Sequence, residues 1–396
     1  MRPWGQTVSF WQRQARRELK PVDVAVVGAG IGGASVAYWL RHIRPDWRVL
    51  VIERRHPAFG ASGRNAGFLL QGFAPCYADD VRQFGAAAAS ELWRLTVENR
   101  DLLLGTFGES VLKAECRGSL TLAGSDEERV RLQASADLLT DAGIDARYLS
   151  PTSVHERMDA SGFHGGLEVA SGAVVDPVAT VNSILGASRV EVIDGAVVEA
   201  ITPAAAGCRI VCDRCAVEAS CVVVAVNAWT PVLFPELSDV VVPRRAQMLV
   251  TEPTDRMLSQ PVYSHDGYYY VRQARDGSVL VGGARDRHVR AEVGFDDAVT
   301  FALQADLSAY VDRHFAWASG LNVRGRWSGT MGFSPTRTPL VGSLTAHGPV
   351  TWLGGFSGHG MGSAFVLGRA VAERINGASP PILRHFDWPR PDADAA

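Results

Sequence analysis

The segment from Asp23 to Gly33 constrains the fold of this chain more than any other feature. An apolar strand, Val24 to Val27, leads into a Gly-x-Gly-x-x-Gly turn, and a second apolar strand ends at Glu53. Gly28 allows a tight turn, Gly30 lets a pyrophosphate approach the N–H groups of a helix N-terminus, and Gly33 lets helix and strand pack closely. Glu53, twenty residues after Gly33, stands where a carboxylate accepts ribose hydroxyls. The pattern predicts a βαβ unit that binds a dinucleotide, with an ordinary strand-to-helix turn as the alternative.

The charge balance gives no indication of a polymeric partner. The chain has 396 residues, 47% of them hydrophobic, and 39 basic residues against 42 acidic ones leave a net charge of −3. This balance argues against a nucleic-acid-binding surface, and no apolar run has the length of a signal peptide or a membrane span. Lysine occurs only at Lys20 and Lys113, which nearly excludes a Schiff-base lysine. We expect a cytoplasmic globular protein without a nucleic-acid partner or a membrane span, and of unknown oligomeric state.

Four of the six cysteines lie close together in the sequence, at 208, 212, 215 and 221. The segments 207–212 and 216–224 are predicted to be two strands joined at Asp213-Arg214, which makes Cys212 and Cys215 neighbours across a hairpin rather than converging metal ligands. We predict structural thiols and no metal. A disulfide across the turn and a metal site are the alternatives.

Two later segments repeat the character of the first motif. The loop 60–68, Gly-Ala-Ser-Gly-Arg-Asn-Ala-Gly-Phe, offers small residues and backbone donors beside Arg64. Near the C-terminus, the strand from Val350 delivers the glycine-rich turn 354–362 to a helix predicted over 363–375. Two such helix starts suit a long cofactor that is held at more than one point.

The remaining segments predict the frame around these motifs. Residues 86–139 have a helical pattern, Asp176-Pro177 predicts a helix start, and Val222 to Trp229 predicts a buried parallel strand with its C-terminal end at the nucleotide. Between 231 and 320 the pattern alternates, which predicts antiparallel strands over 246–251, 268–273 and 278–283. Period two directs Tyr268 and Tyr270 to one face and Tyr269 to the other.

These motifs, in this order, resemble the FAD-dependent D-amino-acid oxidase superfamily over nearly the whole chain. The resemblance rests on the first glycine motif with Glu53, the loop 60–65, Val175-Asp176-Pro177, Asn227-Ala228-Trp229, and the stretch 355–361. The segment 242–253 and the loop at Arg64 look closest to the gamma-glutamylputrescine oxidase type, and 356–360 also matches monomeric sarcosine oxidase.

The resemblance implies a mixed α/β (α+β) fold of the glutathione-reductase type, with a discontinuous Rossmann-like FAD-binding domain and a second, antiparallel-sheet substrate domain. We predict the FAD-binding domain over 21–90, 151–232 and 325–385, and the substrate domain over 91–150 and 233–324. Residues 1–20 are predicted to form a surface arm or short helix, with a membrane-surface helix as the alternative, and 386–396 a C-terminal tail.

The resemblance also assigns cofactor positions across the chain. The residues that fall on these positions are Gly28, Gly30, Ile31, Gly33, Glu53, Arg54, Ala61, Ser62, Arg64, Asn65, Ala66, Gly67, Val198, Asn227, Trp229, Gly358, His359, Gly360 and Met361. Thr330 stands where sarcosine oxidase carries the cysteine that bonds to flavin, so we expect non-covalent FAD. Leu280 replaces the lysine that assists oxygen reduction in that enzyme. This departure implies slow reaction with oxygen and a different electron acceptor, with a charge supplied by His359 or Arg64 as the alternative.

The substrate residues implied by the resemblance depart from the family pattern. We predict Tyr269, together with His359 and Arg64, as catalytic residues, and Arg272, Tyr268, Met331 and Arg285 as substrate-binding residues. Met331, Gly358 and Gly362 occupy positions where relatives carry the arginines or lysine that bind the substrate carboxylate. Either Arg64, Arg272 or Arg285 takes over that contact, or the substrate is a larger amine without an α-carboxylate.

The expected reaction transfers a hydride from a carbon bearing an amine to flavin N5 and leaves an imine that water hydrolyses. Electrons then pass to O2, giving H2O2, or to another acceptor, and the chain does not indicate which. The alternatives are a flavin-dependent enzyme that modifies a tRNA wobble base, a flavin-binding protein without turnover, and a dehydrogenase that shares only the nucleotide fingerprint.

Overall fold

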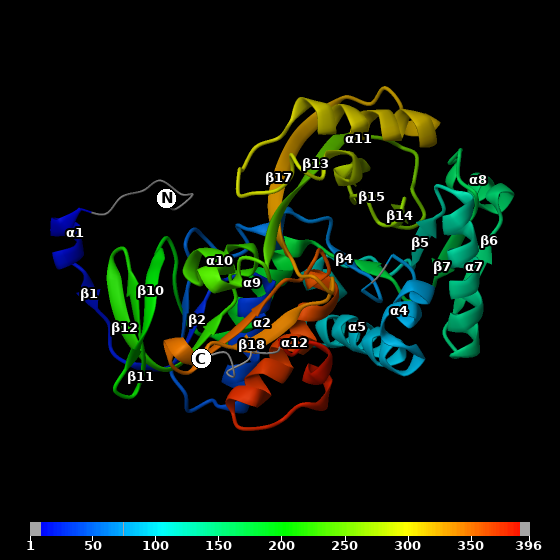
Figure 1. Cartoon of the computed structure of the whole chain (residues 1–396). Helices are drawn as coiled ribbons and strands as arrows, with labels where there is room; N and C mark the ends of the chain where they lie inside the picture. The colour runs from blue at the N-terminus through cyan, green and yellow to red at the C-terminus, as the bar shows by residue number, and fades with distance from the viewer. Residues whose placement is uncertain (1–8, 74, 389–396) are drawn as a thin grey trace. The chain divides into compact units, whose positions relative to one another are not determined.

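The computed structural model describes residues 9–73 and 75–388, which fold into two compact units. The first unit takes residues up to 63 together with 177–244 and the chain from 331 onward, and the second takes 64–176 and 245–330. Each unit is built around its own large sheet (Figure 1). No helix among the described residues is long and apolar enough to cross a membrane.

The first unit is a parallel sheet with helices packed on it. Its central strands run in the order β9, β3, β2, β12, β19, all parallel, and β18 closes the edge antiparallel to β19. A hairpin of β10 and β11 pairs with the first half of β12. The strands are β1 (Arg17–Glu18), β2 (Val22–Val27), β3 (Val49–Ile52), β9 (Glu191–Ile193), β10 (Val198–Ala204), β11 (Gly207–Cys212), β12 (Cys215–Val224), β18 (Leu340–Ser343) and β19 (Val350–Gly354).

The helices of this unit start where the sequence motifs predict. Helix α9 begins at Pro177, as expected from Asp176-Pro177, and the helix expected over 363–375 begins three residues earlier, at Gly360. The helices are α1 (Phe10–Gln14), α2 (Ile31–Ile43), α3 (Ala61–Arg64), α9 (Pro177–Ser188), α10 (Thr230–Leu233) and α12 (Gly360–Ile375). In α1, Phe10 and Trp11 are exposed, as suits a surface arm.

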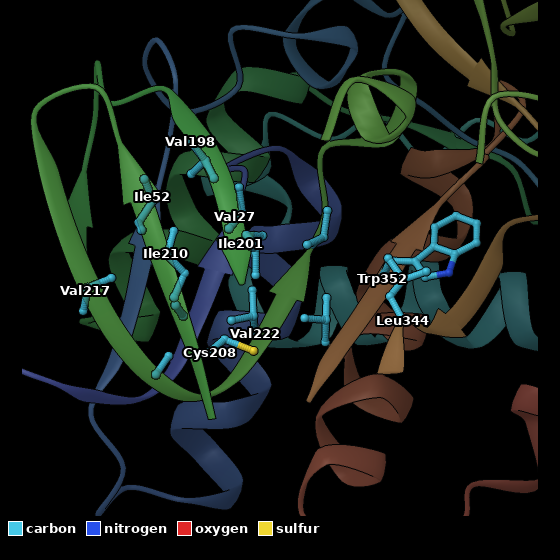
Figure 2. Packing of buried hydrophobic residues seen from close by; sticks show 14 of the residues in the cluster. Val27, Ile52, Val198, Ile201, Cys208, Ile210, Val217, Val222, Leu344 and Trp352 are labelled. Atoms are coloured by element: carbon cyan, nitrogen blue, oxygen red, sulfur yellow. The ribbon is translucent and has the colours of Figure 1, made fainter. Parts of the chain in front are cut away.

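Burial of apolar strand faces holds the first unit together. Val27, Ile52, Val222 and Trp352 contribute side chains from four parallel strands to one cluster, which the hairpin β10–β11 extends through Ile201 and Ile210 (Figure 2). On the helical side, α2 and α12 pack so closely that a Cβ atom on Gly368 would lie 2.5 Å from Cβ of Ser35. This packing fixes the two helix N-termini in one rigid body.

The second unit is a mixed sheet whose strands run in the order β17, β13, β16, β15, β14, β5, β7, β6. Neighbours are antiparallel where β13, β16, β15 and β14 meet, whereas β14 and β5 are parallel. The strands are β4 (Phe68–Leu69), β5 (Ser119–Leu122), β6 (Ala146–Leu149), β7 (Gly166–Val169), β8 (Ala173–Val174), β13 (Val242–Pro253), β14 (Val262–Ser264), β15 (Tyr269–Gln273), β16 (Ser278–Gly283) and β17 (Val323–Phe333).

Helix α11 covers one face of this sheet (Figure 1). Its Leu303, Leu307 and Tyr310 pack against Val271 and Val281. The helices of the unit are α4 (Tyr77–Phe84), α5 (Ala86–Phe107), α6 (Glu109–Leu112), α7 (Asp126–Asp141), α8 (Pro151–Met158) and α11 (Phe301–His314).

Two expectations need correction. The helical pattern over 86–139 is interrupted by β5, because Leu120 and Leu122 alternate with polar residues and both side chains are buried in the sheet core. The segments 64–90 and 151–176, expected in the cofactor domain, group with the second unit, since β4 pairs with β8 and β7 lies between β5 and β6. The assignment of each domain's role stays a prediction.

Candidate functional site

The first glycine turn has no room for side chains. Gly28 adopts φ +104°, and a Cβ atom there would lie 2.7 Å from the carbonyl oxygen of Ala225. A Cβ atom on Gly33 would lie 1.9 Å from the carbonyl oxygen of Gly28. Only glycine therefore fits at these two positions of the turn from β2 into α2. Gly30 is the N-cap residue of α2.

Ser62 completes this turn from α3. Its Oγ accepts a hydrogen bond of 2.9 Å from the N–H of Ile31, and a Cβ atom on Gly30 would lie 2.8 Å from the same oxygen. Ala61 and Ser62 of α3 are thus small residues beside the N-terminus of α2. The positive end of the α2 dipole is a favourable place for an anion.

The carboxylate of Glu53 is held at the C-terminal end of β3. Its Oε2 accepts from the N–H of Ala29 at 2.8 Å, and its Oε1 accepts from the N–H of Arg55 at 2.8 Å. Both oxygens keep a second lone pair, which a ribose diol can use. The structure therefore brings Glu53 to the glycine turn, as the spacing predicts.

Arg54 and Trp229, two further predicted cofactor residues, meet in the first unit. The guanidinium carbon of Arg54 lies 4.1 Å from the centre of the Trp229 ring. Val198 is buried at the start of β10, where its side chain belongs to the hydrophobic core, so only its backbone is available to a ligand.

The C-terminal glycine turn is anchored by Asn227. Its Oδ1 accepts from the N–H of Phe356, and a Cβ atom on Gly332 would lie 2.6 Å from that oxygen. Gly358 adopts φ +98°, and Met331 Sδ would lie 3.9 Å from a Cβ atom placed there. A thioether beside a bare backbone makes a contact surface without charge.

His359 is the N-cap residue of α12, directly before Gly360 and Met361. Burial and the nearby positive charge of Arg337 lower the pKa of His359 to about 4. The imidazole is therefore neutral at pH 7. This counts against the expectation that His359 supplies a positive charge to the site.

In the second unit, the loop that follows α3 is tightly fixed. The N–H of Gly67 donates to Oδ1 of Asn65 at 2.6 Å, and the N–H of Val175 donates to the carbonyl oxygen of Gly67 at 2.8 Å. Arg64 forms a 2.5 Å ion pair with Asp297 and donates to the carbonyl oxygen of Ser328. The predicted site residue Arg64 is therefore paired with an exposed carboxylate, that of Asp297.

Arg272 is engaged in holding this loop. Its Nη1 donates to the carbonyl oxygens of Ala66 and Val175 at 2.8 and 2.9 Å, and Glu115 lies 3.9 Å from its Nη2. The side chain is 11% exposed, and burial lowers the pKa of the guanidinium. Its contacts are those of a residue that fixes the loop, which counts against its predicted role as a free carboxylate clamp.

Tyr269 lies on the face of the sheet that α11 covers, which counts against its predicted catalytic role. Its ring is 4% exposed and stacks on Tyr310 of α11, with ring centres 4.3 Å apart. Tyr268 precedes β15, packs partly against the same core, and lies 5.6 Å from the guanidinium carbon of Arg285. Along β15 the period of two holds, since Tyr269 lies in the α11 core and Tyr270 on the opposite face. The prediction that Tyr268 shares the face of Tyr270 is wrong, because Tyr268 precedes the strand and packs against the α11 core.

The opposite face carries an aromatic cluster that the sequence did not reveal. The ring of Phe68 lies 5.0 Å from that of Tyr263 and 6.2 Å from that of Tyr270, and the two tyrosine rings lie 5.9 Å apart. Leu280 and Trp327 pack against the same cluster. Tyr263 lies on the three-residue strand β14, which is too short to show the alternation of a strand. Within this cluster, only Tyr270 lay in a segment whose alternation predicted a strand.

The two phenol groups of this cluster remain protonated at neutral pH. Desolvation of the partly buried side chains raises the pKa of Tyr270 to about 12 and also raises the pKa of Tyr263. Neither hydroxyl has a hydrogen-bond partner among the described residues, although each can both donate and accept. The face therefore offers two neutral polar groups on an aromatic wall.

The sequence model of the FAD-dependent oxidoreductase family matches residues 23–374 of this chain. The chain belongs to this family. The expected resemblance, the mixed α/β fold and FAD as cofactor are thereby confirmed.

Individual members of the family are similar at low identity. Gamma-glutamylputrescine oxidoreductase of Escherichia coli (strain K12) is 25% identical over 392 residues, which cover 93% of this chain and 88% of that protein. The structure of glycine oxidase from Geobacillus kaustophilus matches with a TM-score of 0.80 at 18% identity, covering 94% and 99% of the two chains. Iminodiacetate oxidase from Chelativorans sp. BNC1 matches with a TM-score of 0.73 at 22% identity, covering 92% and 98%.

The geometry of the first unit fits FAD. A side-chain-free turn at Gly28, Gly30 and Gly33, a carboxylate at its rim and a second glycine-rich helix start are what a dinucleotide requires. No group of cysteine, histidine and carboxylate side chains that could hold a metal occurs among the described residues.

Proposed function

We propose that this FAD-dependent oxidoreductase oxidises a C–N bond of an amine or amino acid, leaving an imine that water hydrolyses. Relatives named for gamma-glutamylputrescine, glycine and iminodiacetate support this substrate class, because each of these compounds carries an amino group. When bound, FAD would accept the hydride, which carries both electrons lost in the oxidation of the C–N bond. The electrons then leave to O2, giving H2O2, or to another acceptor.

In this proposal the first unit holds the cofactor. The N–H groups around Gly30 and Ile31 bind the pyrophosphate, Glu53 binds the ribose, and Arg54 with Trp229 lies beside the adenine. The second glycine turn, Gly358 to Met361, provides further contacts. Thr330 has no thiol, so the cofactor stays non-covalent.

The observation that carries the proposal is the aromatic face of Phe68, Tyr263 and Tyr270. An aromatic wall with neutral hydroxyls favours a neutral amine, because phenol oxygens accept from its N–H groups and a phenol O–H can donate to its nitrogen lone pair. The phenols have pKa values far above 7 and His359 has a pKa of about 4, so none of them is a strong base at neutral pH. Their part is to orient an amine that arrives without its extra proton.

Carboxylate recognition is limited to Arg64 and Arg285 in this proposal. Arg272 already donates to two backbone carbonyls, and Met331 is uncharged. Each remaining arginine lies against another group, Arg64 against Asp297 and Arg285 against the Tyr268 ring. A substrate with an α-carboxylate has to displace Asp297 from Arg64 or bind beside Tyr268.

The test is product analysis with a panel of amines. Holoprotein is incubated with glycine, sarcosine, D-amino acids, N-methylated amines and acylated diamines, and the carbonyl product, the released amine and H2O2 are quantified. The proposal predicts a carbonyl compound and an amine or ammonia in equal amounts from at least one substrate. Turnover of 2-hydroxy acids alone, with no amine consumed, would contradict it.

A further inference from the structure

The hairpin of β11 and β12 places two cysteines opposite one another at its turn. Val211 pairs with Ala216, so the next pair toward the turn is Cys212 and Cys215, separated only by Asp213 and Arg214. Both cysteines are free thiols, with exposed fractions of 0% and 5%, while Arg214 at the turn is exposed. The confirmed hairpin therefore holds a Cys-x-x-Cys pair just beneath the surface.

The spacing of opposed residues in antiparallel strands suits a disulfide. Their Cα atoms lie about 4.5–5.5 Å apart, and a disulfide accepts Cα distances of about 4.4–6.8 Å. The Cβ atoms are the tighter condition, since opposed Cβ atoms lie about 4.5–5.5 Å apart and a disulfide brings them to about 3.5–4.5 Å. Closing the bond therefore contracts the end of the hairpin by about 1 Å.

The two thiols differ in reactivity. The Cys212 thiol donates a hydrogen bond to the Cys215 sulfur and lowers the pKa of Cys215 to about 7, helped by the charges of Arg214 and Arg17. The same contact, together with burial, raises the pKa of Cys212. Loss of the proton is therefore favoured at Cys215 over Cys212, which leaves a resolving thiol beside the attacking sulfur.

The turn between the cysteines is bonded to the segment that follows β9. The N–H of Asp213 donates to the carbonyl oxygen of Val197 at 2.9 Å, and Oδ1 of Asp213 accepts from the N–H of Val197 at 3.0 Å. Nη2 of Arg214 donates to the carbonyl oxygen of Asp194. Any contraction of the hairpin end therefore acts on residues 194–197.

The same segment supports Glu53. The N–H of Ala196 donates to the carbonyl oxygen of Glu53 at 2.9 Å, and the N–H of Glu53 donates to the carbonyl oxygen of Ile193 at 2.8 Å. The N–H of Gly195 donates to the carbonyl oxygen of Arg55, and Arg55 in turn donates to the Glu53 carboxylate. A continuous set of hydrogen bonds thus joins the cysteine hairpin to the carboxylate at the cofactor turn.

We propose that Cys212 and Cys215 form a peroxide-oxidised dithiol site, whose disulfide weakens FAD binding through residues 194–197 and Glu53. The second clause rests on the role proposed for Glu53, whereas the first does not. The Cys215 thiolate attacks one oxygen of hydrogen peroxide, the O–O bond breaks, and hydroxide leaves and is protonated to water. Cys212, as it loses its proton, then attacks the sulfenic sulfur of Cys215, the S–O bond breaks, and a second water leaves. Two thiols and one peroxide give one disulfide and two waters.

The sequence around the turn makes the cross-link directly visible. Trypsin cleaves after Arg209, Arg214 and Arg244, so Cys212 and Cys215 fall on separate peptides, 210–214 and 215–244. Reduced holoprotein is desalted, treated with stoichiometric H2O2, alkylated and digested without reductant. The expected product is a linked pair of these peptides, 2 Da below their summed mass. Cys221 shares the second peptide, so the digest is repeated in Cys221→Ser, which should keep the cross-link, and in Cys215→Ser, which should lose it.

For cofactor affinity, apoprotein is prepared from undigested reduced and peroxide-treated holoprotein and titrated with FAD to equilibrium. Loss of about one hydrogen bond in the linked set should raise the dissociation constant of the oxidised protein about three- to tenfold. Added dithiothreitol should reverse the change, and Cys212→Ser should be insensitive to peroxide.

Each contrary result removes a defined part of the proposal. Peptides 210–214 and 215–244 that stay unlinked and alkylated after peroxide overturn the dithiol site. A complete cross-link with unchanged FAD affinity overturns the coupling. If Glu53→Gln leaves FAD affinity unchanged while the cross-link forms, the proposed role of Glu53 fails and the dithiol site stands.

Discussion

At the scale of single residues, an added methyl group at Gly30 is expected to lower FAD affinity without preventing folding. Its added Cβ atom would meet Ser62 Oγ at 2.8 Å, at the helix start where the pyrophosphate is proposed to bind. The neighbour is a small hydroxyl that can shift, so Gly30→Ala should fold. We expect its FAD dissociation constant to rise at least about tenfold, or about 1.4 kcal/mol.

The matched control for Gly30 is Gly186 in α9. A Cβ atom there meets nothing within 4 Å, so Gly186→Ala should keep the FAD affinity and leave the melting temperature equal or higher. Titration of both apoproteins with FAD distinguishes the two cases. Equal FAD affinities for both variants would remove the glycine turn from the cofactor site.

Tyr269 and Tyr270 offer a test of which face of the second sheet meets substrate. Tyr270→Phe removes a hydroxyl from the aromatic cluster and should raise KM for the best amine about three- to tenfold, the net effect of one hydrogen bond. Tyr269→Phe, on the α11 face, should leave KM unchanged. A raised KM for Tyr269→Phe with an unchanged KM for Tyr270→Phe would instead place the substrate on the face of Tyr269.

Arg272 is expected to act on stability rather than on substrate affinity. Arg272→Ala leaves the carbonyl oxygens of Ala66 and Val175 without their donor, which should cost about 1–3 kcal/mol of unfolding free energy. Urea unfolding and KM are measured together. A raised KM with unchanged unfolding free energy would instead assign Arg272 to the substrate.

At the scale of elements, β7 is fixed to its neighbours through one carboxylate. Glu168 accepts from Arg147 of β6, from Arg157 of α8 and from Gln260, and the two arginines are the main reason that its pKa falls to about 2. Because the folded pKa lies below the unfolded value of 4.5, this stabilisation is complete above about pH 4.5 and is lost as the pH falls toward 2.

Glu168→Gln should therefore lower the unfolding free energy at pH 7 by about 1–3 kcal/mol and flatten its dependence on pH between 4.5 and 2. Glu156→Gln, on the exposed side of α8, serves as control. Urea titrations across this pH range measure both effects. If the unfolding free energy of Glu168→Gln falls with pH as steeply as that of the parent protein, Glu168 is not the cause of the acid sensitivity.

Elements were predictable from sequence where a pattern was long or chemically specific. The glycine turns, the start of α9 at Pro177 and the β11–β12 hairpin follow from local rules, because each depends on residues next to one another. The face of Tyr269 was not predictable, since it depends on which side α11 covers. Strands as short as β14 give no periodic signal, so the part of the aromatic cluster that lies there was missed.

At the scale of the whole molecule, the chain builds its first unit from three separate segments, and the repeated glycine-rich helix starts indicated this arrangement. The boundaries were less accessible, because the pairing of β4 with β8 joins residues more than a hundred positions apart. The family is now established, and the proposed chemistry at the C–N bond is the claim on which the account depends.

Anaerobic mixing of holoprotein with single substrates, followed by the absorbance of the bound flavin, tests that claim most directly. The account predicts that at least one amine or amino acid bleaches the flavin within the turnover time and that the bleaching yields one imine-derived carbonyl per flavin. A flavin that stays oxidised with every amine, yet is reduced by a 2-hydroxy acid, would contradict it.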